Sequence, residues 1–340
     1  MAHKDVYEAI DKTLRDIRSN PKLMGGLILI LAGDFRQTLP IVTNGTPADQ
    51  INACIKHSYI WDHVQSFKLT VNMRARLNNN ANAATFSQTL VDIGNGTMPQ
   101  DNDGKIVLDN SICSLVNSPD QLITKIYPYL NRNFKKMDWL SERCILAPTH
   151  VDVDEINYKC LQKIPGNITT YYSKDAAIND DDTVICPPEV LNSFEIPGIP
   201  SHVLNLKIGA PIILMRNLHS PNLVNGARLH ITELKPNLII ATIMNGPGKG
   251  ESVAIPRIPL IPLNCPINFK RLQFPVKLAF VITINKAQGQ TLTYTGVYLK
   301  TECFSQGQLY VALSRASSNE NVYVFASDGK TTNIVYKSVL

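Results

Sequence analysis

The chain has 340 residues, of which 44% are hydrophobic and 18% charged, and a formal net charge of +5 at pH 7. This length allows two or three domains with sizeable cores, and no run of eighteen apolar residues predicts a membrane span. Seven cysteines without a CxxC pair argue against a disulfide framework and a zinc site, and indicate a reducing compartment. The mild positive charge permits binding to nucleic acid but does not require it.

The first part of the chain contains one predicted helix and two predicted strands. Residues 4–18 carry apolar side chains at helical spacing, which predicts an amphipathic helix. Residues 27–32 (LILILA) are too short and too uniformly apolar for a surface strand, so we expect a parallel strand covered on both faces. A second strand is predicted from Phe67 to about Val71, and residues 95–142 are poorly patterned.

A second α/β pattern starts near Arg143. RCILAPT predicts a buried strand and VDVDEINYKCLQKI the helix after it, while KLAFVITI predicts another buried strand, followed by a turn or short helix in NKAQGQTL. YTGVYL, SQGQLYVALSRAS and NVYVFA then read as strand, helix and strand. This alternation predicts a mostly parallel sheet with covering helices.

Residues 203–262 have a different character. APIILMRNL, ARLHITEL, NLIIATIM and ESVAIPRI are short strand-like runs separated by Pro, Gly and Asn. LKPNL has turn chemistry, and NGPGKGES is interpreted as a hairpin loop. We therefore expect a small β-barrel inserted into the second α/β part.

Polar residues follow several predicted strands. In open parallel sheets, ligands bind beyond the carboxyl ends of the strands, which is where these residues fall. Any one of them alone is most simply explained as solvating a loop. They are Asp34, Arg36 and Gln37 after the first strand, Arg74 after LTVN, Thr149 and His150 after CILAP, and residues 285–290 after KLAFVITI, with Arg315 on the last predicted helix.

The order of these segments resembles the PIF-type (petite integration frequency) DNA helicases of superfamily one, including the Helitron-transposon branch. GDFRQTLPIV is similar to motif III, LTVNMRA to motif IV, ITINKAQGQTL to motif V and GQLYVALSRA to motif VI. CILAPTHVDVDEIN resembles the start of the second lobe, and LKIGAPIILMRNL with NGARL an SH3-like insert. Motifs III, V and VI in this order make a specific combination, although single short motifs mislead.

The resemblance implies an α/β fold of RecA-like P-loop NTPase lobes. Residues 1–66 would form a partial first lobe. Residues 67–202 and 263–340 would form a complete second lobe, with residues 203–262 as an SH3-like β-barrel insert.

The resemblance also implies roles for individual residues. Gln37, Arg74 and Arg315 would be catalytic, with Gln37 sensing the γ-phosphate and the two arginines acting as arginine fingers. Gly289 and Gln290 would also contact the nucleotide, next to Gln37, Arg74 and Arg315. The residues implied to face single-stranded DNA are Thr149, His150, Thr283, Asn285 and Lys286.

Two elements of such a motor are not found in this sequence. One is the phosphate-binding loop G-x-x-x-x-G-K-[ST], and the other is the acidic pair that organises Mg²⁺. The chain resembles the family cut immediately after that pair, known as Walker B. The full-length family uses ATP and Mg²⁺, and no residue of this chain is assigned as a metal ligand. We therefore expect this chain alone to be unable to hydrolyse ATP.

The implied function is an ATP-dependent, 5′-to-3′ DNA helicase that couples ATP hydrolysis to translocation on single-stranded DNA and duplex unwinding. It would act in DNA repair, recombination, telomere maintenance or transposon replication. The implied partners are single-stranded and forked duplex DNA, and the protein would be monomeric and nuclear, with the mitochondrion as an alternative. A degenerate, non-catalytic protein that binds single-stranded nucleic acid is the competing hypothesis.

Overall fold

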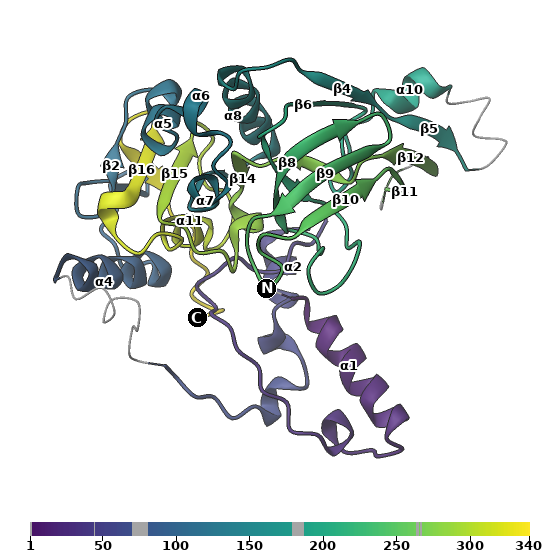
Figure 1. Ribbon diagram of the computed structural model, residues 1–340. Helices are drawn as coiled ribbons and strands as arrows, with labels where there is room; N and C mark the ends of the chain where they lie inside the picture. Colours follow the sequence, from purple (N-terminus) through teal and green to yellow (C-terminus); the bar gives the residue numbers. More distant parts are fainter. Residues whose placement is uncertain (1, 44, 70–80, 179–186, 263–264, 266) are drawn as a thin grey trace. The chain divides into compact units, whose positions relative to one another are not determined.

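The computed structural model describes residues 2–43, 45–69, 81–178, 187–262, 265 and 267–340 (Figure 1). They form two compact units, residues 1–118 with 287–340 (unit 1) and residues 119–286 (unit 2). The sequence suggested four segments instead, and those boundaries remain predictions. Among the described residues, no helix combines the length and apolar character needed to cross a membrane.

Unit 1 has a small parallel sheet and several short helices. Its sheet contains β15 beside β16 and β16 beside β2, each pair parallel, and β1 pairs antiparallel with β17. The elements are α1 (Lys4–Ile17), η1 (Leu23–Gly26), α2 (Pro47–Asn52), η2 (Ile55–His57), η3 (Trp61–His63), α4 (Ala81–Asn95), β1 (Lys105–Val107), β2 (Ser114–Leu115), β15 (Tyr294–Leu299), α11 (Gln308–Leu313), η5 (Asn319–Asn321), β16 (Val322–Ala326) and β17 (Lys330–Thr332).

Helix α1 confirms the predicted helix but not a buried apolar stripe. Its one buried residue is Asp11, whose carboxylate accepts hydrogen bonds from the Met24 amide at 2.5 Å and the Tyr59 hydroxyl at 2.8 Å. Burial raises the pKa of Asp11, but these hydrogen bonds and the adjacent Arg15 outweigh it and leave the pKa below its ordinary value. The helix is therefore fixed to η1 and Tyr59 through a carboxylate.

The strand predicted at residues 27–32 is wrong. These residues lie outside any strand, and Ile28 and Ile30 are 95% and 88% exposed. A strand needs hydrogen-bonded neighbours, and the described residues supply none for this run. The prediction for residues 67–71 is also not supported, since residues 67–69 are not in a strand and the rest lie outside the described residues.

Unit 2 joins a parallel strand pair to antiparallel sheets. β14 pairs in parallel with β3, and α8 packs against both. The elements are α5 (Pro119–Ile126), α6 (Leu130–Asn133), α7 (Met137–Ser141), β3 (Arg143–Ala147), α8 (His150–Lys163), β4 (Thr169–Tyr172), β5 (Lys174–Ala177), α10 (Pro188–Asn192), β6 (Val203–Leu206), β7 (Pro211–Leu214), β8 (Arg228–Lys235), β9 (Leu238–Ile243), β10 (Ser252–Pro256), β11 (Ile258–Leu260), β12 (Phe269–Gln273), β13 (Val276–Leu278), β14 (Val281–Thr283) and η4 (Ile284–Ala287), whose last residue belongs to unit 1.

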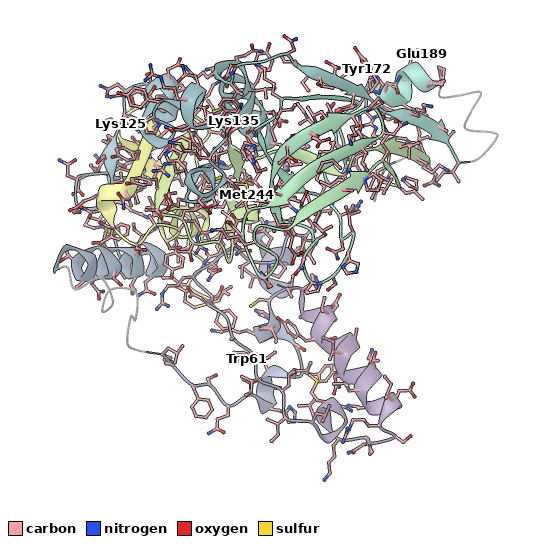
Figure 2. The ribbon with its side chains drawn as sticks, in the orientation of Figure 1. Trp61, Lys125, Lys135, Tyr172, Glu189 and Met244 are labelled. Atoms are coloured by element: carbon pink, nitrogen blue, oxygen red, sulfur yellow. The ribbon has the colours of Figure 1, made fainter. Side chains whose placement is uncertain are left out.

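The four strand-like runs of the predicted insert are confirmed as β7, β8, β9 and β10. Together with β13 they form an antiparallel sheet in the order β10-β9-β8-β7-β13. Lys235 pairs with Leu238, so Pro236 and Asn237 make the tight turn expected from LKPNL. The NGPGKGES segment connects β9 to β10, and Met244, labelled in Figure 2, is buried just before it.

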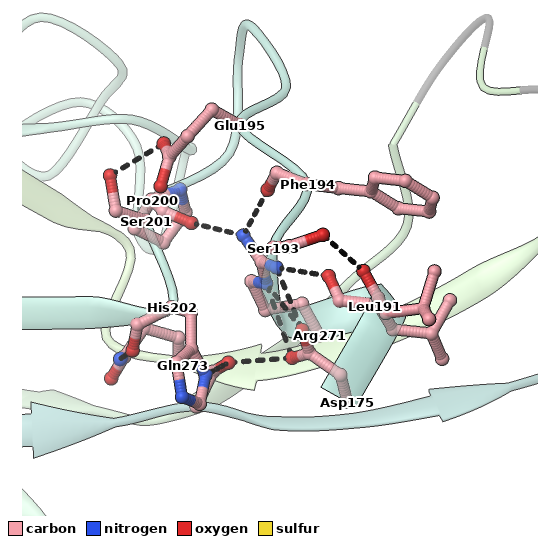
Figure 3. Close-up of polar contacts among 12 residues, drawn as sticks. Asp175, Leu191, Ser193, Phe194, Glu195, Pro200, Ser201, His202, Arg271 and Gln273 are labelled. Carbon is pink, nitrogen blue, oxygen red and sulfur yellow. Dashed lines mark hydrogen bonds and ion pairs between the residues drawn. The ribbon is translucent and has the colours of Figure 1, made fainter. Parts of the chain in front are cut away.

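A buried ion pair fixes the edge of unit 2 at β5 and β12. The side chains of Arg271 and Asp175 are both fully buried, and Arg271 Nη2 lies 2.7 Å from Asp175 Oδ2 (Figure 3). The same guanidinium donates to the carbonyls of Leu191 at 2.9 Å and of Phe194 and Pro200 at 3.1 Å each. Arg271 thus connects two strands to α10 and to the segment that follows it.

Candidate nucleotide and DNA sites

In unit 1, the turn at residues 34–38 is held by the helix that carries the motif VI resemblance. The Tyr310 hydroxyl donates to Asp34 Oδ2 at 2.8 Å, and Asp34 Oδ1 accepts from the Arg36 amide at 3.0 Å. Arg36 Nε donates to Asn95 Oδ1 at 2.7 Å. Burial and the Asp34 charge raise the pKa of Tyr310, so its hydroxyl stays protonated and remains a donor. Asp34 and Arg36 therefore shape the turn.

Gln37 is presented by this turn and its side chain remains available. Its amide donates to the Asp34 carbonyl at 3.1 Å, and among the described residues its side-chain amide makes no hydrogen bond. Next to it, Thr38 Oγ1 accepts from Gln288 Nε2 at 2.7 Å. Gly307 lies against the backbone of Arg36 and Gln37, where an added Cβ would overlap the Arg36 carbonyl oxygen.

Arg315 is buried against the loop that contains Gly289 and Gln290. Its Nη1 donates to the carbonyls of Ala287 at 3.4 Å and Gln290 at 3.1 Å, and its Nε to that of Val311 at 2.9 Å. Gly289 has a φ of 77°, which a glycine adopts without strain. The structure thus joins Arg315 and the 287–290 loop, and Gln288 links that loop to the turn carrying Gln37. To act as an arginine finger, Arg315 would have to exchange its hydrogen bonds to these carbonyls for hydrogen bonds to the nucleotide.

In unit 2, Thr149 and His150 lie where β3 ends and α8 begins. The Thr149 side chain caps α8 by accepting from the Asp152 amide at 3.2 Å, and its hydroxyl donates to Asp152 Oδ2 at 2.6 Å. Partial burial and then the charge of Lys277 lower the pKa of His150, with Asp154 acting in the opposite direction. His150 therefore carries no charge at neutral pH, because its ordinary pKa is already about 6.5.

The other predicted DNA residues gather at the end of β14. Thr283 ends the strand, and Asn285 and Lys286 follow in η4. Lys286 Nζ donates to Asn225 Oδ1 at 2.6 Å, while Asn285 Oδ1 is buried and accepts no hydrogen bond from a described residue. Desolvation and the charge of Arg216 lower the pKa of Lys286.

Sequence reasoning missed Arg216, Lys277 and Asn225 at this site. Arg216 and Asn225 lie in the predicted insert, far from motif V in the chain, and no spacing rule connects them to Lys286. Neither Arg216 nor Lys277 is paired with a carboxylate in the described part of the chain. Arg74, predicted as the second arginine finger, lies outside the described residues.

Comparison with known families matches two segments of the chain. Residues 1–104 match the PIF1-like helicase model, and residues 189–234 match the model of the 2B domain of the DNA helicase Pif1. The second match covers β6 and β7, the loop containing Arg216 and Asn225, and most of β8. The matches therefore include both the turn that carries Gln37 and part of the unit 2 site.

Individual relatives extend the similarity along nearly the whole chain. The ATP-dependent DNA helicase PIF1 of Danio rerio is 26% identical over 330 residues, which are 96% of this chain and 45% of that protein. The crystal structure of Pif1 helicase from Candida albicans has a TM-score of 0.66 and 23% identity, and covers 100% of this chain and 72% of that one. Pif1 from Bacteroides, solved with ADP-AlF3 and single-stranded DNA, has a TM-score of 0.64 and 20% identity over 95% and 68% of the two chains.

The similar structures confirm the predicted RecA-like α/β fold. The chain spans about 45% of the length of its first curated relatives. The matched segments, the order of the motifs and the fold make this chain similar to the PIF1-like DNA helicases.

Proposed function

We propose that the chain contributes to an ATP-dependent DNA helicase, with unit 2 binding the phosphates of single-stranded DNA. The observation that supports DNA binding most directly is the gathering of Lys286, Arg216 and Asn225 at the carboxyl end of β14. Ammonium, guanidinium and amide groups hold a phosphate backbone without reading bases, as a motor that moves along any sequence requires. Pif1 from Bacteroides, which has a similar fold, was solved with single-stranded DNA, and this supports single-stranded DNA as the ligand.

In this proposal, unit 1 binds the nucleotide. Gln37 would offer its free amide to the γ-phosphate, and Arg315 its guanidinium once its bonds to the 287–290 loop are exchanged. ATP would supply the energy for translocation. Directional 5′-to-3′ movement, action on forked DNA and nuclear residence follow from the family resemblance and belong to the proposal.

DNA binding is tested by anisotropy titration of a labelled oligothymidylate at several salt concentrations. We expect affinity to fall as salt rises, because each neutralised phosphate releases counterions. Arg216→Ala and Lys286→Ala should each reduce the slope of log K against log salt by about 0.7. The matched control is Lys174→Ala, an exposed lysine on β5. Wild-type affinity that does not change with salt would refute the proposal.

ATP hydrolysis gives a second test. The 340-residue chain is expected to show negligible ATPase activity even with single-stranded DNA, because its sequence lacks the phosphate-binding lysine motif. A steady-state phosphate-release assay measures this, with Arg315→Ala as the control for contaminating enzymes. Turnover that Arg315→Ala abolishes would contradict the expectation. DNA binding without turnover is also what the non-catalytic alternative predicts.

A further inference from the structure

Unit 2 contains a cavity beside the proposed phosphate site. Its volume is about 570 Å³, and it lies between the first turns of α8, the segment 195–205 and the end of β13. His150 and Lys277 both line it, so it is continuous with the residues already discussed. Pockets for small ligands range from about 300 to 1,000 Å³, and a nucleobase with its sugar fits within this volume.

The walls of the cavity are mainly apolar. They include Ile196, Pro197, Leu204, Met215 and Leu278. Asn157, a polar lining residue, is fully engaged with the backbone. Its side-chain nitrogen donates to the carbonyls of Leu278 at 3.3 Å and Val281 at 2.8 Å, and its oxygen accepts from the Val281 amide at 3.0 Å. A ligand here would be held by stacking and dispersion rather than by Asn157.

The charges of the lining disfavour an anion as the occupant. At neutral pH the lining has one ammonium, Lys277, against the carboxylates of Asp154 and Glu195, since His150 is neutral. One Glu195 oxygen already accepts from the Ser201 hydroxyl at 2.8 Å. Arg216 does not line the cavity, lies close enough to Lys286 to lower its pKa, and is not paired with a carboxylate among the described residues. The arrangement suits a ligand with an uncharged apolar part inside the cavity and an anionic part outside it.

We infer that the cavity takes one unstacked base of the single strand whose phosphates lie along Lys277, Lys286 and Arg216. This inference rests on the proposed DNA binding. A nucleotide within a strand combines a flat, uncharged base with an adjacent phosphate. Because the walls are apolar, any base can occupy the cavity, as a motor that moves along any DNA sequence requires.

The test compares two oligonucleotides of equal length and charge, oligothymidylate and a chain of abasic deoxyribose phosphates. The wild-type chain should bind the thymidylate more tightly. Val203 lies in the cavity wall and is 42% exposed, so Val203→Glu places a carboxylate there at little cost to folding. We expect this variant to reduce the ratio of the two affinities by about 5- to 150-fold, the range for loss of one stacked base.

Val190→Glu is the matched control, because Val190 is 40% exposed on α10 and does not line the cavity. It adds the same charge to the same unit and should leave the ratio unchanged. Using the ratio cancels any general repulsion between the new carboxylate and the phosphates. An unchanged ratio in Val203→Glu, or equal binding of both oligonucleotides by the wild type, overturns the inference alone. Failure of the wild type to bind either oligonucleotide overturns the proposed function itself.

Discussion

Arg271→Met is expected to destabilise unit 2 by about 3–5 kcal/mol, the typical cost of leaving one member of a buried ion pair without its partner. Asp175 would then be a fully buried carboxylate, and among the described residues only the Ser173 hydroxyl, at 2.6 Å, would still donate to it. The carbonyls of Leu191, Phe194 and Pro200 would lose their donors as well.

The two tryptophans of the chain make this measurable unit by unit, since Trp61 lies in unit 1 and Trp139 in unit 2. In a Trp61→Phe background, urea unfolding followed by tryptophan fluorescence reports on unit 2. Lys270→Met, at an exposed position of the same strand, is the matched control and should change stability little.

The double variant Arg271→Met with Asp175→Leu separates the two possible causes of this loss. If the unpaired carboxylate dominates, the double variant should recover most of the lost stability, because apolar side chains tolerate burial. If Arg271→Met alone has the same urea midpoint of unfolding as the wild type, the ion pair contributes nothing to the stability of unit 2. The interpretation of the contacts in Figure 3 as a structural link is then wrong.

Gly307→Ala is expected to destabilise unit 1 by about 2–5 kcal/mol. Its φ of 67° costs a side chain roughly 1–2 kcal/mol. The new Cβ would also overlap the Arg36 carbonyl, and such overpacking costs about 1–3 kcal/mol more. In a Trp139→Phe background, urea unfolding is read from Trp61, whose ring lies edge-on to Phe35 with centroids 5.6 Å apart.

Gly104→Ala is the matched control for Gly307→Ala. Gly104 also lies in unit 1 and has a φ of 74°, but no atom lies within 4 Å of the position a Cβ would take. Gly104→Ala therefore measures the free-energy cost of a side chain at positive φ, without a steric overlap of the new Cβ. Equal destabilisation by the two variants would show that the turn carrying Gln37 moves away from Gly307 without cost, so the helix α11 would not position that turn.

Much of the fold could be predicted from the sequence where the signal is local. β3, α8, β15 and β16 each appear at the predicted place, because a run of apolar residues or a helical repeat is enough to define them. The hairpin between β8 and β9 follows from two turn residues, Pro236 and Asn237.

The errors and omissions arise where structure depends on distant residues. Residues 27–32 have a strand's composition, but a strand exists only when a neighbour accepts its hydrogen bonds. The approach of Arg216 to Lys286, and of Asp175 to Arg271, depends on how β-strands far apart in the chain are placed. A charged residue such as Arg271 in FKRLQ gives no local sign of being buried rather than solvated.

The exposed aliphatic run at residues 27–31 has a practical consequence for anyone concentrating this protein. Its peptide groups beyond Leu27 bond to no strand among the described residues, and its side chains favour contact with one another over water. When two molecules associate along this run, their peptide groups can hydrogen-bond to each other and their aliphatic side chains are removed from water. A higher protein concentration therefore accelerates association while the folded units stay intact. Precipitation on storage would then begin from native protein. Ile28→Lys or Ile30→Lys would delay it without changing either proposed binding site.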